Sequence, residues 1–270
     1  MSDGFFTALA AVTNALFLIG GVYIYLSLIR QVGARELDSG VGSERTFGLP
    51  DLILALSLGT LFALNAAAGS PHPDKIALGT KDLLFNAFVS AGMFLFVAAF
   101  LRFRGLDVNS LGGFSKLGFW RTLATGGILL FAAYPLIALA DVITRRVLGG
   151  ETSRQGIVEL FSGSQTIQQR ALIIVLAIAI APMVEEFVFR FFLYGVVKRY
   201  AGRFVGLAAN SVLFAAVHAH APSAVPLFVL GACFTIAYEW SGSILVSMTM
   251  HALFNSLTLV ALAFPDFFQQ

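Results

Sequence analysis

Long apolar runs constrain the fold of this 270-residue sequence more than any other feature. A helix needs about 20 mostly apolar residues to cross a bilayer. Because backbone polar groups in lipid must be paired within the protein, such runs predict helices. We therefore expect an all-α, multi-spanning membrane helix bundle with about eight transmembrane helices, at residues 5–29, 49–68, 83–101, 122–143, 170–200, 204–220, 224–240 and 244–264.

Composition agrees with a membrane protein and argues against other classes. The chain is 58% hydrophobic and 12% charged, whereas a soluble domain carries roughly twice that charged fraction. A net charge of +2 without a basic cluster argues against nucleic-acid binding. The single cysteine, Cys233, excludes an internal disulfide. The first apolar run, with no Lys or Arg before Arg30, is too long for a signal-peptide core, so we expect a retained span.

The stretch APMVEEFVFRFFLYG, residues 181–195, places three ionisable groups in an apolar run. Each costs about 2.5–3.5 kcal/mol at the membrane centre and needs a partner or a role. Glu186 and Arg190 are four residues apart, so they share a helix face and can form an ion pair. Glu185 is rotated by about 100° and must find its partner on another helix. Pro182 predicts a kink in one long helix, with a break into a ninth segment as the alternative.

Two later runs add further polar candidates. His218 follows Phe214 by one helical turn, and His251 and Asn255 share a face four residues apart. A carboxylate, two imidazoles and an amide suit amide hydrolysis: Glu185 can take a proton from water, a histidine can hold that water, and His or Asn can stabilise an oxyanion. Interhelical hydrogen bonding is the alternative for each residue. A metal site made by His218, His251 and Glu185 is a further alternative, without a recognised spacing.

Three motifs in this region resemble those of a known family. EEFVFR resembles the EExxxR motif of the CPBP family of intramembrane glutamic endopeptidases, which includes the eukaryotic prenyl-protein CAAX endopeptidase and bacteriocin-processing or immunity relatives. FAAVH, residues 214–218, is similar to its FxxxH motif, and HALFN, residues 251–255, to its HxxxN motif. The resemblance covers about residues 170–264.

The resemblance implies peptide-bond hydrolysis without a cofactor or an obligatory metal. Glu185 would be the water-activating base and His218 would position the water, while His251 and Asn255 would stabilise the oxyanion. The supporting residues would be Glu186, Arg190 and Phe214. We expect one integrated membrane domain, with N-terminal transmembrane helices of unassigned role in residues 1–165 and the CPBP-type catalytic core in residues 166–270.

The expected function is an intramembrane endopeptidase acting on a membrane-tethered peptide or protein, in a bacterial plasma membrane. The alternative is a non-catalytic scaffold or immunity-type protein that retains the polar pocket. A proton-coupled transporter is disfavoured because no internal repeat is evident. The expected partners are the lipid bilayer and the substrate, and the sequence does not indicate an oligomeric state. Basic residues in alternate loops predict that both termini lie outside.

Overall fold

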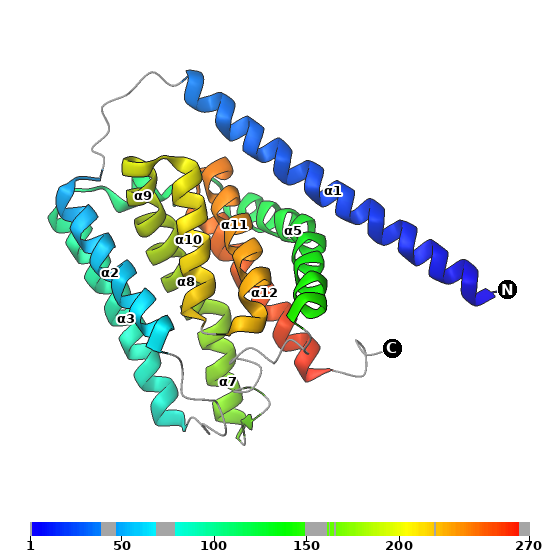
Figure 1. Ribbon diagram of the computed structural model, residues 1–270. Helices are drawn as coiled ribbons and strands as arrows, with labels where there is room; N and C mark the ends of the chain where they lie inside the picture. The colour runs from blue at the N-terminus through cyan, green and yellow to red at the C-terminus, as the bar shows by residue number, and fades with distance from the viewer. Residues whose placement is uncertain are drawn as a thin grey trace.

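The computed structural model shows a bundle of helices, and its described residues contain no strand (Figure 1). The structure describes residues 2–38, 47–68, 79–148, 161, 163, 164, 166–218 and 220–264. The helices are α1 (Ser2–Asp38), α2 (Leu49–Ala68), α3 (Thr80–Phe103), α4 (Val108–Gly112), α5 (Phe119–Leu148), α7 (Ile167–Val175), α8 (Ala181–Glu185), α9 (Tyr194–Ala201), α10 (Arg203–Val217), α11 (Ala224–Ser241) and α12 (Ile244–Ala263). Two π-helical segments, η1 (Leu176–Ile180) and η2 (Glu186–Leu193), and a 3₁₀ turn, η3 (Ala221–Ser223), complete the set.

The expected multi-spanning all-α bundle is confirmed. Seven described helices are long and apolar enough to cross a membrane, and the segments α7 to α9 form one of them, Ile167–Ala201. Pro182 therefore lies inside a continuous helix, and the chain does not break there into a ninth segment. The expected eighth span is shorter than predicted, because α10 has 15 residues. It begins after Gly202 and ends before His218, a length of about 22 Å.

Helices from both halves of the sequence pack in the same bundle. α5 contacts α11 and α12, and α1 contacts α5 and α11. The phenolic hydroxyl of Tyr25 in α1 donates to the carbonyl of Leu129 in α5 at 2.9 Å. The division into residues 1–165 and 166–270 stays a prediction.

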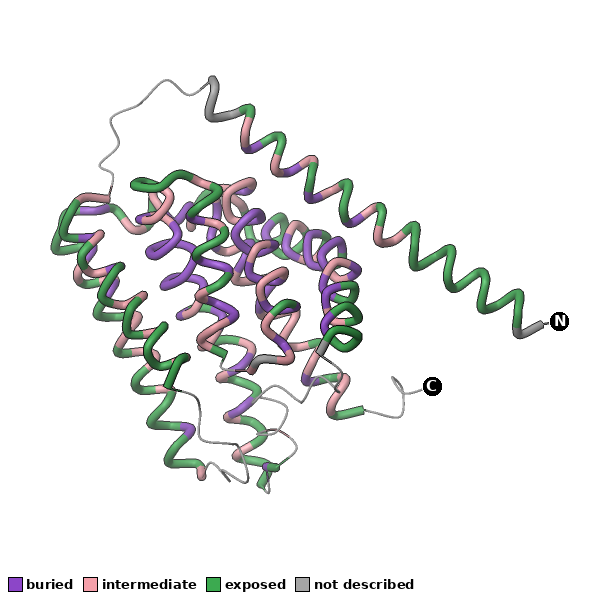
Figure 2. Tube along the Cα trace, viewed as in Figure 1, coloured by how far each residue is buried: buried purple, intermediate pink, exposed green. Residues whose placement is uncertain are grey.

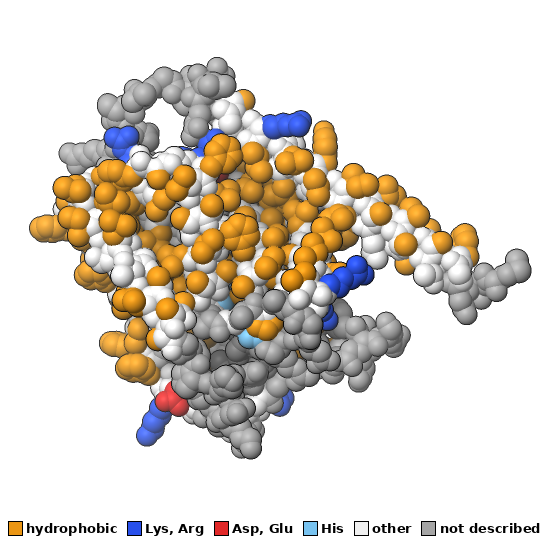
Figure 3. Space-filling view, in the orientation of Figure 1, with side chains coloured by type: hydrophobic (Ala, Val, Ile, Leu, Met, Phe, Trp, Pro, Cys, Tyr) orange, Lys and Arg blue, Asp and Glu red, His pale blue; other side chains and the backbone are white. Residues whose placement is uncertain are grey.

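Apolar side chains cover much of the outer surface (Figure 3). On α3, for example, Phe85 and Phe88 are 68% and 76% exposed. Apolar patches of this extent are typical of a surface that faces lipid. Burial is concentrated in the centre of the bundle, while α2 and the N-terminal half of α1 are mostly exposed (Figure 2).

The centre of the bundle is the segment η2, in which all eight residues are buried. Aromatic rings from other helices pack on it: Phe94 of α3 lies 4.7 Å from Phe187, and Phe62 of α2 lies 5.5 Å from Phe189. Burial on every side fixes the orientation of this segment, and its two ionisable residues are therefore held in place with it.

A second ionic group joins α9, α10 and α11. Glu239 accepts hydrogen bonds from Lys198 at 2.6 Å and from Arg203 at 3.3 Å. The carboxylate of Glu239 therefore links three helices.

Candidate active site

Glu186 and Arg190 lie in η2 with no solvent exposure. Arg190 Nη1 donates to Glu186 Oε1 at 2.9 Å, which is the ion pair that the four-residue spacing predicts. A buried charge without a partner would be strongly destabilising. The pairing therefore makes the burial of both side chains possible.

Aromatic rings surround the Arg190 guanidinium. Its central carbon lies 4.0 Å from the ring centroid of Phe214 in α10 and 5.1 Å from that of Phe234 in α11. Desolvated contacts of this kind between a cation and a ring face are favourable by about 2 kcal/mol. Phe214 was a predicted supporting residue. Phe234 was not predicted, because nothing in the sequence distinguishes it among 27 phenylalanines.

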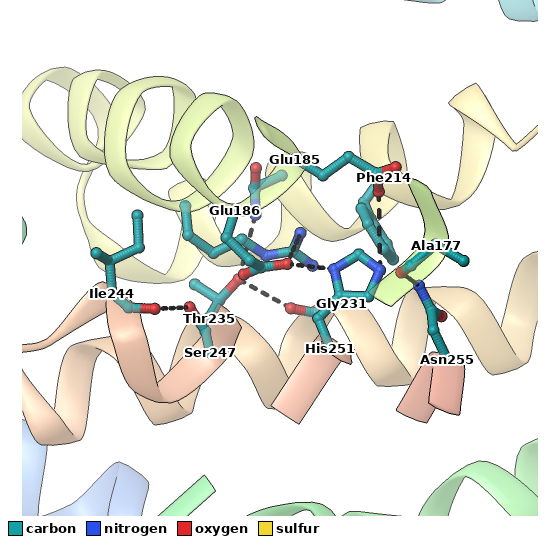
Figure 4. A network of polar contacts seen from close by, with 12 residues as sticks. Ala177, Glu185, Glu186, Phe214, Gly231, Thr235, Ile244, Ser247, His251 and Asn255 are labelled. Carbon is teal, nitrogen blue, oxygen red and sulfur yellow. Dashed lines mark hydrogen bonds and ion pairs between the residues drawn. The ribbon is translucent and has the colours of Figure 1, made fainter. Parts of the chain in front are cut away.

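The imidazole of His251 lies between the two glutamates (Figure 4). Its Nδ1 lies 2.9 Å from Glu186 Oε1 and its Nε2 lies 4.0 Å from Glu185 Oε2. A carboxylate only accepts hydrogen bonds, so Nδ1 carries a proton and donates to Glu186. The ring of Phe234 stacks on the imidazole at 5.1 Å and 28°. These contacts fix the ring plane and direct Nε2 toward Glu185.

Glu185 differs from its neighbour in its exposure and in its contacts, although Oε2 of Glu186 is likewise without a hydrogen-bond partner among the described residues. The Glu185 side chain is 28% exposed, and its Oε2 has no hydrogen-bond partner among the described residues. The carboxylate lines a pocket of about 210 Å³ between α3 and the long helix. The other lining residues are Leu83, Asn86, Ala87 and Ser90 from α3, and Ile173, Leu176, Ala177, Ile180 and Ala181 from the long helix.

His218 lies at the C-terminal end of α10 and is exposed. Its Nδ1 donates to the carbonyl of Phe214 at 2.7 Å, which leaves Nε2 as an acceptor in the neutral imidazole. The ring is 4.7 Å from that of Phe214, which is itself 6.0 Å from the ring of His251. His218 is thus joined to the other site residues through Phe214. Within the described residues it forms no ion pair with Glu185.

Asn255 holds a backbone carbonyl of the long helix. Its Nδ2 donates to Ala177 O at 2.8 Å, and Ala177 precedes Pro182 by five residues. In η1 the bonds run between residues five apart, as from the N–H of Ala181 to Leu176 O. Proline has no N–H, so Ala177 O has no partner in this pattern, and Asn255 supplies one. The second hydrogen of Nδ2 remains for another acceptor.

Asn86 and Ser90 are site residues that the sequence did not reveal. Asn86 is exposed, and both residues line the pocket that contains Glu185. The positions 83, 86, 87 and 90 lie on one helix face. This spacing would have predicted a shared wall of a site only if the helix opposite α3 had been known. In the part of the chain that the structure describes, no three His, Cys, Asp or Glu side chains are grouped to hold a metal ion.

The apolar bundle and its buried ionisable group define a multi-spanning membrane protein with a polar site inside the membrane region. Residues 167–257, about a third of the chain, match the family model Rce1-like, described as type II CAAX prenyl endopeptidase Rce1-like. The match confirms the resemblance predicted from the three motifs, and it supports a membrane protease that acts on a peptide or protein. A search of the curated proteins and a search of the solved structures gave no match.

Proposed function

We propose that the chain is a glutamic intramembrane endopeptidase of a bacterial plasma membrane, cleaving a membrane-tethered peptide or protein. The observation that carries the proposal is the different state of the two adjacent glutamates. Glu186 is fully buried and its Oε1 is bound to Arg190 and His251. The Glu185 side chain is 28% exposed and lines the pocket, and its Oε2 lies 4.0 Å from His251 Nε2. The family match over residues 167–257 supports the same reading.

In the proposed mechanism Glu185 removes a proton from water as the oxygen bonds to the carbonyl carbon of the scissile peptide. Nε2 of His218 accepts a hydrogen bond from that water. The tetrahedral oxyanion is stabilised by the second N–H of Asn255 and by His251 when Nε2 is protonated. Glu185 then returns the proton to the departing amine as the C–N bond breaks. Glu186 and Arg190 orient His251, and none of these steps uses a metal.

The test replaces one carboxylate at a time and measures cleavage of a membrane-tethered peptide in vesicles. We expect Glu185→Gln to reduce kcat by about a thousandfold or more while the protein inserts and purifies normally. Asp141→Asn is the matched control, because it makes the same chemical change in a half-exposed ion pair with Arg145. Retained cleavage in Glu185→Gln would reject the mechanism and favour the non-catalytic scaffold.

A further inference from the structure

The pocket at Glu185 is an elongated groove. Its lining on the long helix runs from Ile173 to Glu185, so Glu185 lies at one end of it. Twelve residues of helix correspond to about 16–18 Å along the axis. An extended peptide rises about 3.3 Å per residue, so the groove has the length of about five residues.

The opposite wall is formed by one face of α3, outside the segment that matches the family model. Asn86 and Ser90 are its polar members and lie one helical turn apart, a rise of about 6 Å. Alternate residues of an extended chain are about 6.6 Å apart, which is close to that spacing. A peptide backbone in the membrane region needs partners for its N–H and C=O groups. An amide and a hydroxyl can both donate and accept such bonds.

The groove is narrow for its length. The 210 Å³ is the space that the centre of a water molecule can occupy, and at about 10–15 Å³ for each water it has room for about 14–21 water molecules. Spread over the length of five residues, that is about three or four waters per residue, which is room for a peptide backbone and a small side chain. Ala87 lies between the two polar residues on the same wall and has a small side chain. A larger side chain at this position would extend into the groove.

We propose that this groove binds about five substrate residues in an extended conformation, all on one side of the scissile bond, and selects small side chains opposite Ala87. Asn86 and Ser90 hold the backbone of alternate substrate residues. The proposal rests on the proposed function, because it takes Glu185 as the group that marks the position of the scissile bond.

The first test measures side-chain selection. The probe is a synthetic peptide with one transmembrane helix and an extended tail, in which Gly, Ala, Leu or Phe is placed at successive positions. Vesicles contain phosphatidylethanolamine and phosphatidylglycerol. We expect kcat/KM at one or two positions to fall by about tenfold from Ala to Phe. Ala87→Leu should lower kcat/KM for the Ala peptide by about tenfold. Ala99→Leu, the same change at an exposed position of α3, should leave it within about twofold.

The second test detects binding without turnover. In a Glu185→Gln background, Asn86→Cys should form a disulfide with probe peptides that carry cysteine within about five residues of the cleavage position. Leu95→Cys, 62% exposed on the same helix, is the control and should not.

The outcomes separate the two proposals. Cleavage that depends on Glu185 but is equal in Ala87→Leu and Ala99→Leu, with no crosslink at residue 86, would overturn the groove and leave the protease. A crosslink at residue 86 without cleavage by the unmodified protein would retain the groove as a peptide site and reject the protease. Absence of both would overturn both.

Discussion

At the scale of single residues, His251 shows how two adjacent glutamates acquire different properties. Glu186 Oε1 accepts from both Arg190 and His251 at 2.9 Å, so its charge is already bound inside the protein. Glu185 Oε2 lies 4.0 Å from the other imidazole nitrogen, beyond hydrogen-bond length. One carboxylate is therefore held by the fold, whereas its neighbour is partly exposed and lines the pocket.

The Glu186–Arg190 pair gives a prediction about stability. Both side chains are fully buried. Arg190→Leu therefore leaves the charge of Glu186 without its cation, and Glu186→Gln leaves the charge of Arg190 without its anion. We expect each single variant to lower the free energy of unfolding by about 3–5 kcal/mol. The double variant should lose less than the sum. Thermal unfolding in detergent measures this cycle, and additive losses would show that the pair does not act as a unit.

The residue-level contacts were predictable only where both partners lie on one helix. The four-residue spacing predicts the Glu186–Arg190 pair directly. The stacking of Phe234 on His251 joins two helices, and a phenylalanine in an apolar run carries no signal of that contact. The bond from Asn255 to Ala177 also depends on the neighbouring helix, because its acceptor is a backbone atom that the sequence does not mark.

At the scale of helices, the two π-helical segments on either side of α8 distinguish the site from the rest of the bundle. Such segments are rare and are frequent at functional sites. The sequence predicted one long helix with Pro182 inside it, and that prediction is confirmed. It did not predict the wider helical pattern, because the change from four-residue to five-residue hydrogen bonds depends on how the helix packs.

Asn255 allows structural and catalytic roles to be separated. Asn255→Ala removes the partner of Ala177 O and should lower the free energy of unfolding by about 1–3 kcal/mol. In a Pro182→Ala background residue 182 gains an N–H that can bond this carbonyl, so the loss should shrink. If Asn255 also stabilises the oxyanion, cleavage in the double variant stays low although stability recovers. Unfolding and cleavage assays on the four proteins measure both; recovered cleavage would contradict the oxyanion role.

The connection between α9 and α10 is set by Gly202. Its φ of 84° and ψ of 167° lie in a region that is essentially restricted to glycine. No heavy atom outside its chain neighbours lies within 4 Å of an added Cβ, so the cost of Gly202→Ala is one of backbone strain. We expect a loss of about 1–3 kcal/mol in the free energy of unfolding.

The control for this prediction is Gly92→Ala in α3, where an added Cβ also meets open space and the backbone is helical. That variant should be neutral or more stable by about 0.5–1 kcal/mol. Equal unfolding midpoints for the two alanine variants would argue against strain at Gly202.

At the scale of the whole molecule, the short helix α10 decides how the chain is arranged across the membrane. The long helix Ile167–Ala201 and α11 run in the same direction, and α10 runs back between the end of α9 and the start of α11 (Figure 1). At 15 residues it is shorter than the hydrocarbon thickness of about 30 Å would require. The sequence predicted the bundle and its reversals from apolar length. It overestimated α10 because the predicted span extended to residue 220, whereas the helix ends at Val217.

The arrangement predicts where the chain termini lie. Seven long helices together with α10 give an even number of passages, so reporters fused to the two termini should be found on the same side. The distribution of basic residues in alternate loops predicts that this is the outer side of the membrane. Protease protection of the two tags in spheroplasts measures this. Tags on opposite sides would show that α10 does not complete a passage.

The contact between Asn255 and Ala177 O also has a consequence for how positions 182 and 255 vary together in evolution. Pro182 creates the carbonyl without a partner, and Asn255 supplies the partner, so the two positions share one structural task. Relatives that lack the proline no longer need the asparagine for that task. If such relatives retain the asparagine, its role in the reaction is what maintains it. If the proline and the asparagine change together, the hydrogen bond to the backbone carbonyl is what maintains the asparagine.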